Sequence, residues 1–196
     1  MEQKWFGWAM RRNLQLVVEF HNECNRLMGN QVFEINQELE ACNDTNREYD
    51  LIYAKNCYDR TFDRMLLVNT FLMMYSFLEE FMYIVWKKFS KGVHVSNKGS
   101  IKRFKDVFKK SLGMDLEKDS DWQFIVRCEK IRNCLLHANG RIDLSTEQSE
   151  VRKIISSSNG LLDSDLQRII LKRDFIVKVN YVLNSFIEKV ESKEST

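Results

Sequence analysis

The chain has 196 residues, of which 44% are hydrophobic and 30% charged, and its formal net charge is +2. This balance is typical of a globular protein with its own core, and it excludes a disordered or fibrous chain. So small a net charge does not by itself indicate a nucleic-acid-binding protein; only local clusters of basic residues could do so. The sequence contains no proline and only 7 glycines. Because both residues break helices, their scarcity predicts long helices and few tight turns.

The five cysteines are odd in number and include no C-x-x-C pair, which argues against a disulfide framework and against a zinc site. Free thiols suit a reducing compartment, so we expect a cytoplasmic protein. Arg11 and Arg12 interrupt any signal-peptide core near the start of the sequence. The uncharged apolar segment from Met65 to Leu78 is shorter than the roughly 18 residues of a membrane span. We interpret it as a buried core helix, with a membrane span as the less favoured alternative.

The first part of the chain has helical periodicity. Apolar residues recur at three- and four-residue steps from Trp5 to about Ala41, and Gly29-Asn30 could divide this region into two helices. The polar residues that follow predict a turn, with Asp44 or Thr45 as the N-cap of the next helix.

A second helical region extends from about Arg47 to Ser90, as one long helix or as two. Its second half is apolar on nearly every side, which indicates a central helix covered by others. Glycine and polar residues between positions 91 and 100 predict a loop. A short basic helix follows from Ile101 to Leu112, with Ser100 as its N-cap and Gly113 at its end.

The cluster Asp119-Ser120-Asp121 predicts the start of a helix that runs from Trp122 to about Ala138, and Gly140 occupies a C-terminal cap position. Two short β-branched segments, Val151 to Ile155 and Arg168 to Leu171, could then pair as a small hairpin. Asp174 begins a final amphipathic helix. We therefore predict one all-α domain over residues 1–196, a bundle of five to six helices with a small β-hairpin-like insertion before the last helix.

Several common active-site motifs are missing from the sequence. It has no Gly-rich phosphate loop, no G-x-S-x-G and no H-E-x-x-H. His21, His94 and His137 are far apart, and none has a second His or Cys at the spacing of metal ligands. We therefore expect neither a metal site nor a cofactor.

Two adjacent carboxylates, Glu79 and Glu80, lie within the apolar helix. A buried carboxylate is costly unless it is paired, so at least one of them should meet a cation or reach water. Neighbouring helix positions point about 100° apart, so the two cannot face one substrate together. The favoured interpretation is structural, with one glutamate exposed and the other in a salt bridge. The alternative is that one of them orients a catalytic arginine.

The basic helix concentrates positive charge on one side. Its basic residues are Lys102, Arg103, Lys105, Lys109 and Lys110, while Phe104 and Phe108 can anchor the other side in the core. Such a stripe suits the backbone of RNA, and binding through it should depend on salt. A solvated surface helix without a ligand is the more favoured interpretation of the same residues.

The most informative stretch is Arg132-Asn133-Cys134-Leu135-Leu136-His137. An Arg and a His at this spacing are close to a chance expectation in a sequence of this composition, so the context has to support the interpretation. Polar Asn133 directly follows the Arg, Leu135 and Leu136 would pack the helix inward, and the helix ends just after the His.

This arrangement resembles the HEPN superfamily, in which an Arg, a polar residue and a His four to six residues beyond the Arg define the active site. The resemblance covers about residues 47–190, which leaves residues 1–45 as an N-terminal helical extension. It implies that Arg132, Asn133 and His137 are the catalytic residues of a metal-independent endoribonuclease that leaves 2′,3′-cyclic phosphate ends, either a toxin or a phage-defence component. In many antitoxin-controlled members a Tyr stands two residues after the His. This chain has Asn139 there, so a partner that modifies that Tyr is not expected.

The chemistry fits these residue types. Imidazoles titrate near neutrality, so His137 can take the proton of a 2′-hydroxyl or protonate the 5′-oxygen that leaves. Arg132 can donate two hydrogen bonds to phosphate oxygens, and Asn133 can orient the His or the phosphate. On a helix, Asn133 and His137 share a face, whereas Arg132 starts about 140° away from His137.

The resemblance further implies a homodimer, because HEPN-like ribonucleases combine two Arg/His sets in one cleft. The expected partners are RNA, a second copy of the chain, and an antitoxin or another regulatory protein. No association with a membrane is expected. One alternative is a catalytically inactive HEPN-like module that binds a protein or a nucleotide. Another is a purely structural helical dimer, in which Arg132 binds backbone carbonyls or Glu79 and Glu80, and the helix dipole favours His137 at its C-terminus.

Overall fold

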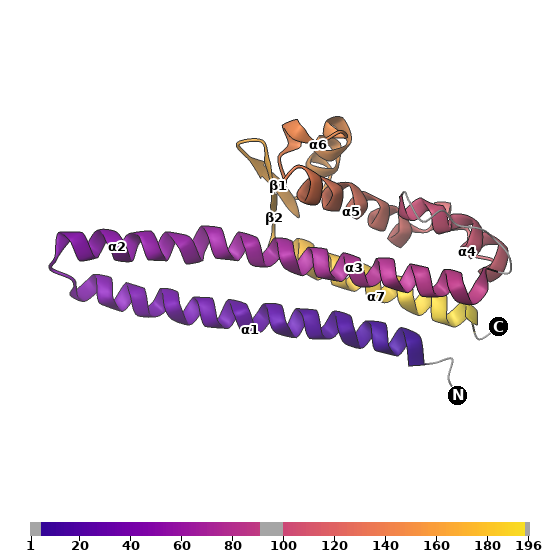
Figure 1. Cartoon of the computed structure of the whole chain (residues 1–196), viewed down its shortest axis with the longest axis horizontal. Coiled ribbons are helices and arrows are strands. Elements are labelled where there is room, and N and C mark those ends of the chain that lie inside the picture. The colour runs from indigo at the N-terminus through magenta and orange to yellow at the C-terminus, as the bar shows by residue number, and fades with distance from the viewer. Residues whose placement is uncertain (1–4, 91–99, 195–196) are drawn as a thin grey trace.

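The computed structural model describes residues 5–90 and 100–194, and its dominant feature is a long antiparallel pair of helices (Figure 1). α1 extends from Trp5 to Ala41 without a break, so Gly29-Asn30 does not divide it. Asp44 caps the return helix, because its side chain accepts hydrogen bonds from the amides of Asn46 and Arg47. That helix is continuous through α2 (Thr45–Asn56), a π-helical turn (Cys57–Phe62) and α3 (Asp63–Phe89).

The remaining elements complete a bundle at one end of this pair. They are three 3-10 turns (Ile101–Phe104, Leu116–Lys118 and Ile142–Leu144), α4 (Lys105–Leu112), α5 (Ser120–His137), α6 (Gln148–Ser156), β1 (Leu162–Asp165), β2 (Arg168–Leu171) and α7 (Arg173–Glu194). With α2 and α3 counted as one, the described residues form 6 helices, and a single two-stranded hairpin precedes the last of them. The predicted all-α bundle is therefore confirmed. The predicted loop over positions 91–99, with His94, lies outside the described residues.

The predicted pairing partner of β2 was wrong. Val151 to Ile155 belong to α6, in which Val151 is buried while Ile154 and Ile155 pack against the core. These residues lie three and four positions apart, so as a helix they form one apolar face, and this packing outweighs the β propensity of branched side chains. β2 instead pairs with β1, with Leu162 opposite Leu171.

The connection between the strands is consequently only two residues long. Leu166 and Gln167 have φ values of 44° and 64°. A tight hairpin turn of this kind needs positive φ at both central positions, because only then does its twist match that of the strands. Neither residue is a glycine, asparagine or aspartate, so the sequence lacked the usual signal for this turn.

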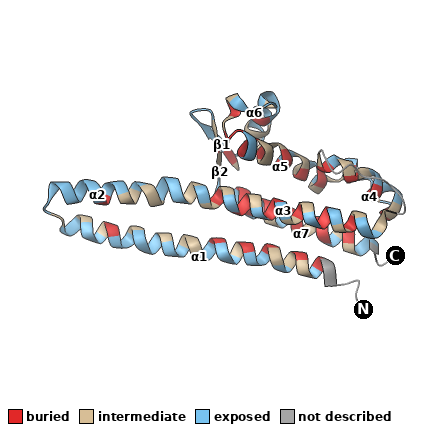
Figure 2. Ribbon diagram, in the orientation of Figure 1, coloured by how far each residue is buried: buried red, intermediate tan, exposed pale blue. Residues whose placement is uncertain are grey.

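α7 runs through the middle of the core and packs against α1, α3 and α5. The Phe186 ring lies against those of Phe81, Phe108 and Trp122, at centroid distances of 6.5, 5.8 and 6.0 Å. α1 contributes Met10, Leu14 and Val17 to the same core. Figure 2 shows that buried residues gather in this half of the molecule, whereas the outer halves of α1 and α2 are mostly exposed.

A buried polar contact ties α1 to α3. His21 Nδ1 lies 2.8 Å from Thr70 Oγ1, and Asn25 Nδ2 lies 2.8 Å from His21 Nε2. The Nδ2 group of Asn25 can only donate, so the ring accepts at Nε2 and donates from Nδ1 to the Thr70 hydroxyl. Burial, followed by the charge of Arg173, lowers the pKa of His21, which favours this neutral form.

Within the described residues, the continuous helix Thr45–Phe89 is the one helix long and apolar enough to cross a membrane. Its most apolar window is 44% buried inside the bundle. Phe71, Met74 and Leu78 are almost completely enclosed. This burial agrees with the predicted central core helix, in which apolar side chains on several sides are covered by neighbouring helices.

Candidate functional site

α5 carries the Arg132-to-His137 stretch, and its start is firmly fixed. The side chain of Asp119 accepts a hydrogen bond from the Trp122 amide at 2.9 Å. Lys189 of α7 pairs with Asp119 and Asp121 at 2.7 and 2.8 Å. Burial opposes ionisation of Asp119, but the bonds from Lys189 and the Trp122 amide dominate, so its pKa is lowered. The predicted N-cap cluster is confirmed.

The other end of α5 turns sharply after His137. Asn139 and Gly140 have φ values of 50° and 73°, and the amides of Ala138 and Gly140 both donate to Cys134 O, at 3.1 and 3.0 Å. The left-handed cap thus begins at Asn139, which tolerates this conformation, one residue before the predicted glycine. A Cβ at Gly140 would lie 3.3 Å from Leu135 Cδ2 and 3.8 Å from Arg64 Nη2. A side chain at Gly140 would therefore crowd Leu135, whereas Arg64 Nη2 would lie at an ordinary contact distance.

Arg132 is half-buried and reaches α3. Its Nη2 donates to Glu79 Oε2 at 3.3 Å, and its Nη1 donates to Asn133 Oδ1 at 3.1 Å. Glu80 is exposed. The structure therefore pairs one glutamate and leaves the other in water, as the structural interpretation expects. The same contact is also one through which Glu79 could orient Arg132.

His137 is exposed at the last position of α5. Asn133 lies one turn before it on the same face, so two of the three predicted catalytic residues share one surface. Arg132 is joined to Asn133 by a hydrogen bond but starts on another side of the helix. One chain therefore gathers Arg132, Asn133 and His137 at one end of α5, with Arg132 directed toward Glu79.

The basic helix lies far from these residues. Lys102 and Lys105 line a shallow hollow with Trp122, and about 22 Å of helix separates Trp122 from His137. Lys105 pairs with Glu117, and the Arg103 guanidinium lies 4.8 Å from the centre of the Phe104 ring. The fully exposed cations of the stripe are consequently Lys102, Lys109 and Lys110.

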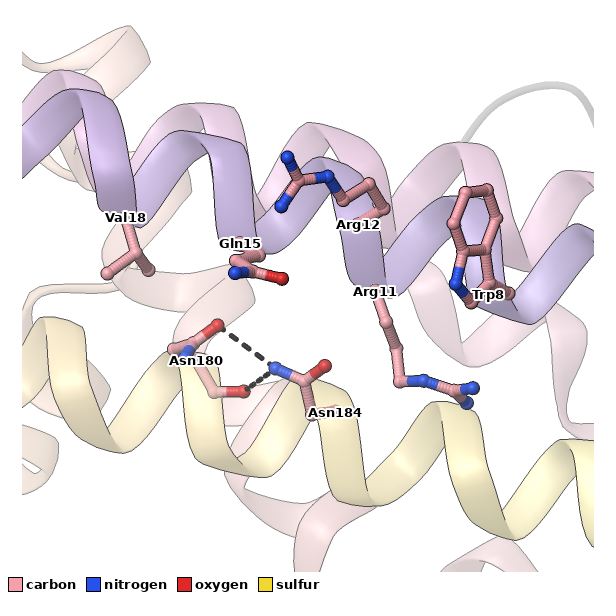
Figure 3. Close-up of a pocket in the computed structure, with 7 residues that line it drawn as sticks. All are labelled: Trp8, Arg11, Arg12, Gln15, Val18, Asn180 and Asn184. Atoms are coloured by element: carbon pink, nitrogen blue, oxygen red, sulfur yellow. Dashed lines mark hydrogen bonds between the residues drawn. The ribbon is translucent and has the colours of Figure 1, made fainter.

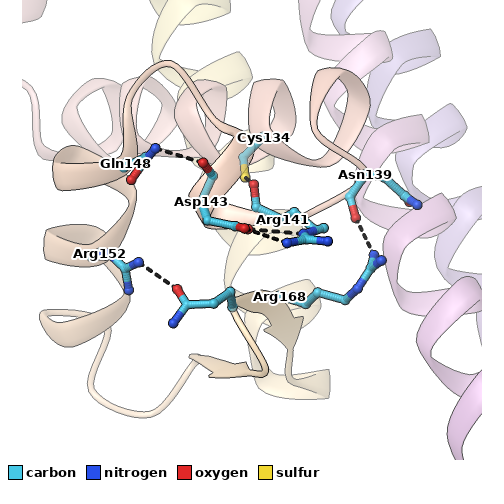
Figure 4. Close-up of polar contacts among 8 residues, drawn as sticks. Cys134, Asn139, Arg141, Asp143, Gln148, Arg152 and Arg168 are labelled. Carbon is cyan, nitrogen blue, oxygen red and sulfur yellow. Dashed lines mark hydrogen bonds and ion pairs between the residues drawn. The ribbon is translucent and has the colours of Figure 1, made fainter.

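A groove that the sequence did not indicate lies beside the end of α5. Its volume is about 440 Å³, and its lining comes from the π-helical turn, α3, α5, the residues just after α5, and β2: Arg60, Thr61, Arg64, Met65, Val68, Asn69, Leu135, Asn139 and Arg168. Arg168 donates to Asn139 O at 3.0 Å, and Figure 4 shows its side chain directed toward Asn139. Asn139 follows His137 by two residues, which span at most about 7 Å, so the groove lies at the same end of α5 as His137.

A second cavity, of about 390 Å³, lies between α1 and α7 (Figure 3). Its two arginines are both matched by carboxylates: Arg11 pairs with Glu191, and Arg12 lies 3.4 Å from Glu19. Asn184 is occupied by hydrogen bonds to Asn180. The charges of this cavity are therefore already compensated within the protein.

The buried polar groups near α5 are poor nucleophiles and bases. Burial raises the pKa of Cys128 and of Cys134, and it raises the pKa of Tyr75, so all three stay protonated. All five cysteines are free. In the part of the chain that the structure describes, no three His, Cys, Asp or Glu side chains converge closely enough to hold a metal ion.

Comparisons of the chain with protein-family models, with curated proteins and with solved structures found no match.

Proposed function

We propose that the protein is a metal-independent endoribonuclease of HEPN type, in which Arg132, Asn133 and His137 act on RNA. One observation supports this above the others. An Arg, an Asn and an exposed His lie together where α5 ends against α3, beside a groove rich in arginine. His137 is exposed and so has no packing role that would explain it, and an imidazole is a group that can act as a general acid or base.

In the proposed reaction the 2′-oxygen attacks phosphorus and the bond from phosphorus to the 5′-oxygen breaks. The 2′-hydroxyl proton passes to a base, and an acid supplies a proton to the leaving 5′-oxygen. The products are a 2′,3′-cyclic phosphate and a 5′-hydroxyl. Arg132 and Asn133 donate hydrogen bonds to the phosphate oxygens as charge builds there. Glu79 holds the Arg132 guanidinium beforehand.

A single imidazole serves only one side of the phosphorus, so the proposal includes a homodimer that supplies a second His137. Met65 and Leu136 lie at or near the groove, yet they are 54% and 48% exposed. Large apolar side chains on a surface of this kind suit contact with another protein. We further propose a cytoplasmic toxin or phage-defence component that is controlled by an antitoxin or another regulatory protein.

Cleavage of single-stranded and structured RNA in the presence of EDTA tests the proposal. Arg132→Ala and His137→Ala should each slow cleavage by about 10²- to 10⁴-fold, because each removes a charge- or proton-handling group. Arg127→Ala is the matched control, since Arg127 is an exposed arginine on the same helix. It should cleave like the wild type. The proposal fails if wild-type protein cleaves no RNA, or if both active-site variants cleave as fast as the control.

The contact between Arg132 and Glu79 favours a second candidate function, a catalytically inactive HEPN-like module that binds a protein or a nucleotide. In that case Arg132 serves to join α5 to α3. Arg132→Ala would then lower the melting temperature, and a partner captured by the wild type would still bind both Arg132→Ala and His137→Ala. Because the pair is partly exposed, its contribution to stability is small, about 0–1 kcal/mol.

A further inference from the structure

The groove beside α5 holds positive charge that no described carboxylate neutralises. Arg60, Arg64 and Arg168 line it, and none of them forms an ion pair with a described carboxylate. The one side-chain hydrogen bond among the three runs from Arg168 to the backbone oxygen of Asn139. Other arginines of the chain do have such partners: Arg173, for example, lies 2.6 Å from Asp63.

Three unpaired guanidinium groups around one groove repel one another unless an anion lies between them. Planar guanidinium groups suit anions with paired oxygens, phosphate among them, because each can donate two parallel hydrogen bonds. The groove volume of about 440 Å³ lies within the range of small-molecule sites. Met65, Val68 and Leu135 give part of the lining an apolar surface for a sugar or a base.

The backbone around the groove is also specialised. Arg60 and Thr61 belong to the π-helical turn that interrupts the helix between α2 and α3. Such turns are rare, and within α-helices they occur frequently at functional sites. Close to Leu135 and Arg64, Gly140 has a φ of 73°, a backbone conformation that favours glycine.

We propose that this groove binds backbone phosphate of RNA next to the nucleotide on which His137 acts. The identity of the ligand as RNA phosphate rests on the proposed function, whereas the preference for an anion with paired oxygens follows from the groove itself. The groove lies at the His137 end of α5, with Asn139 in its lining, whereas the basic helix lies at the other end of α5. The arginine groove, rather than the basic helix, is thus the surface that holds the substrate beside the proposed catalytic residues.

The test measures binding of a fluorescent single-stranded RNA in a His137→Ala background, so that the RNA stays intact. Arg60→Gln/Arg64→Gln removes two charges from the groove. Arg26→Gln/Arg47→Gln is the matched control, because it removes two exposed arginines from the outer part of the helical pair. Affinity is measured by anisotropy over a range of salt concentrations, and far-UV circular dichroism checks that each variant is folded.

The groove variant should bind RNA at least about tenfold more weakly, and the slope of log affinity against log salt should become shallower by about 1.4, which is about 0.7 for each lost phosphate contact. The control should keep the parent slope. The proposal is overturned if the groove variant binds like the control, if the parent shows no salt-dependent binding, or if only Lys109→Gln/Lys110→Gln loses affinity. Cleavage by the intact protein is measured separately. If the groove variant binds RNA weakly and the wild type cleaves no RNA, the proposed nuclease activity is overturned and the proposed phosphate-binding groove is not.

Discussion

Replacing Asp119 by alanine removes two contacts from the start of α5, the helix that carries Arg132 and His137. One carboxylate oxygen accepts from the Trp122 amide at 2.9 Å, and the other binds Lys189 Nζ at 2.7 Å. Loss of a helix N-cap costs about 1 kcal/mol. The partly exposed ion pair adds about 0.2–1 kcal/mol. Asp119→Ala should therefore lower the free energy of unfolding by about 1–2 kcal/mol at neutral pH, which for a chain of this size lowers the melting temperature by about 2–8 °C.

Two further variants separate the cap from the ion pair. Asp119→Asn keeps a cap acceptor without the charge, so it should lose only the ion-pair share, below about 1 kcal/mol. Lys189→Met removes the same pair from the other side, although it also leaves Asp121 without its lysine. Urea unfolding, monitored by circular dichroism, gives the free energy of unfolding of all three variants. Unfolding of Asp119→Ala at the wild-type urea concentration would refute both contacts, and an Asp119→Asn variant as unstable as Asp119→Ala would refute the role of Asp119 as a cap.

Three further perturbations test other parts of the account. The pKa of His21 is lowered in the folded state. The unfolded chain therefore binds a proton at this residue first, so the free energy of unfolding should fall as the pH drops below about 6.5. Urea titrations of His21→Gln should show a flatter dependence of that free energy on pH, and a dependence equal to that of the wild type would contradict this. Phe186→Ala should lower the free energy of unfolding in urea by about 3–5 kcal/mol, because it removes a ring from the aromatic core. Phe33 is 62% exposed, so Phe33→Ala should change that free energy by no more than about 0.5 kcal/mol. Equal losses for the two variants would contradict the described burial. Gly140→Ala forces a side chain onto a backbone with positive φ and should cost about 1 kcal/mol. Its Cβ would also lie 3.3 Å from Leu135 Cδ2, which has to shift to make room. A melting temperature equal to that of the wild type would contradict this expectation.

Much of the helical framework could be predicted from local sequence, because its signals are local. Asp44, Ser100 and Asp119 cap helices, and Gly113 ends α4 with a φ of 63°. α1 passes Gly29 without a break, because one exposed glycine costs only about 1 kcal/mol and contacts along the helical pair offset that cost. Ile35 and Leu51 are buried in that outer region.

The hairpin shows where local signals were insufficient. The β-branched residues of α6 suit a strand by type and a helix by spacing, and burial against α5 and the hairpin decides between them. β1 begins with buried Leu162, but its remaining residues are exposed and polar. The sequence therefore gave no alternating pattern by which this strand could be recognised.

The candidate site was predictable only along α5. Helix geometry predicted that Asn133 and His137 share a face and that Arg132 starts on another, and Arg132 does turn to Glu79. The groove could not be predicted in this way. Arg60 and Arg64 lie one helical turn apart, but Arg168 joins them only because β2 packs beside the end of α5. No local periodicity encodes a contact over so long a separation in sequence.

The chemistry of the cut ends tests the proposed ribonuclease most directly. RNA is incubated with wild-type protein and with His137→Ala in the presence of EDTA, and the termini of the fragments are identified by mass spectrometry. The account predicts 2′,3′-cyclic phosphate and 5′-hydroxyl ends from the wild type, and their loss with His137→Ala. Fragments with 3′-hydroxyl and 5′-phosphate ends, cleavage that requires a metal ion, or unchanged cleavage by His137→Ala would contradict it.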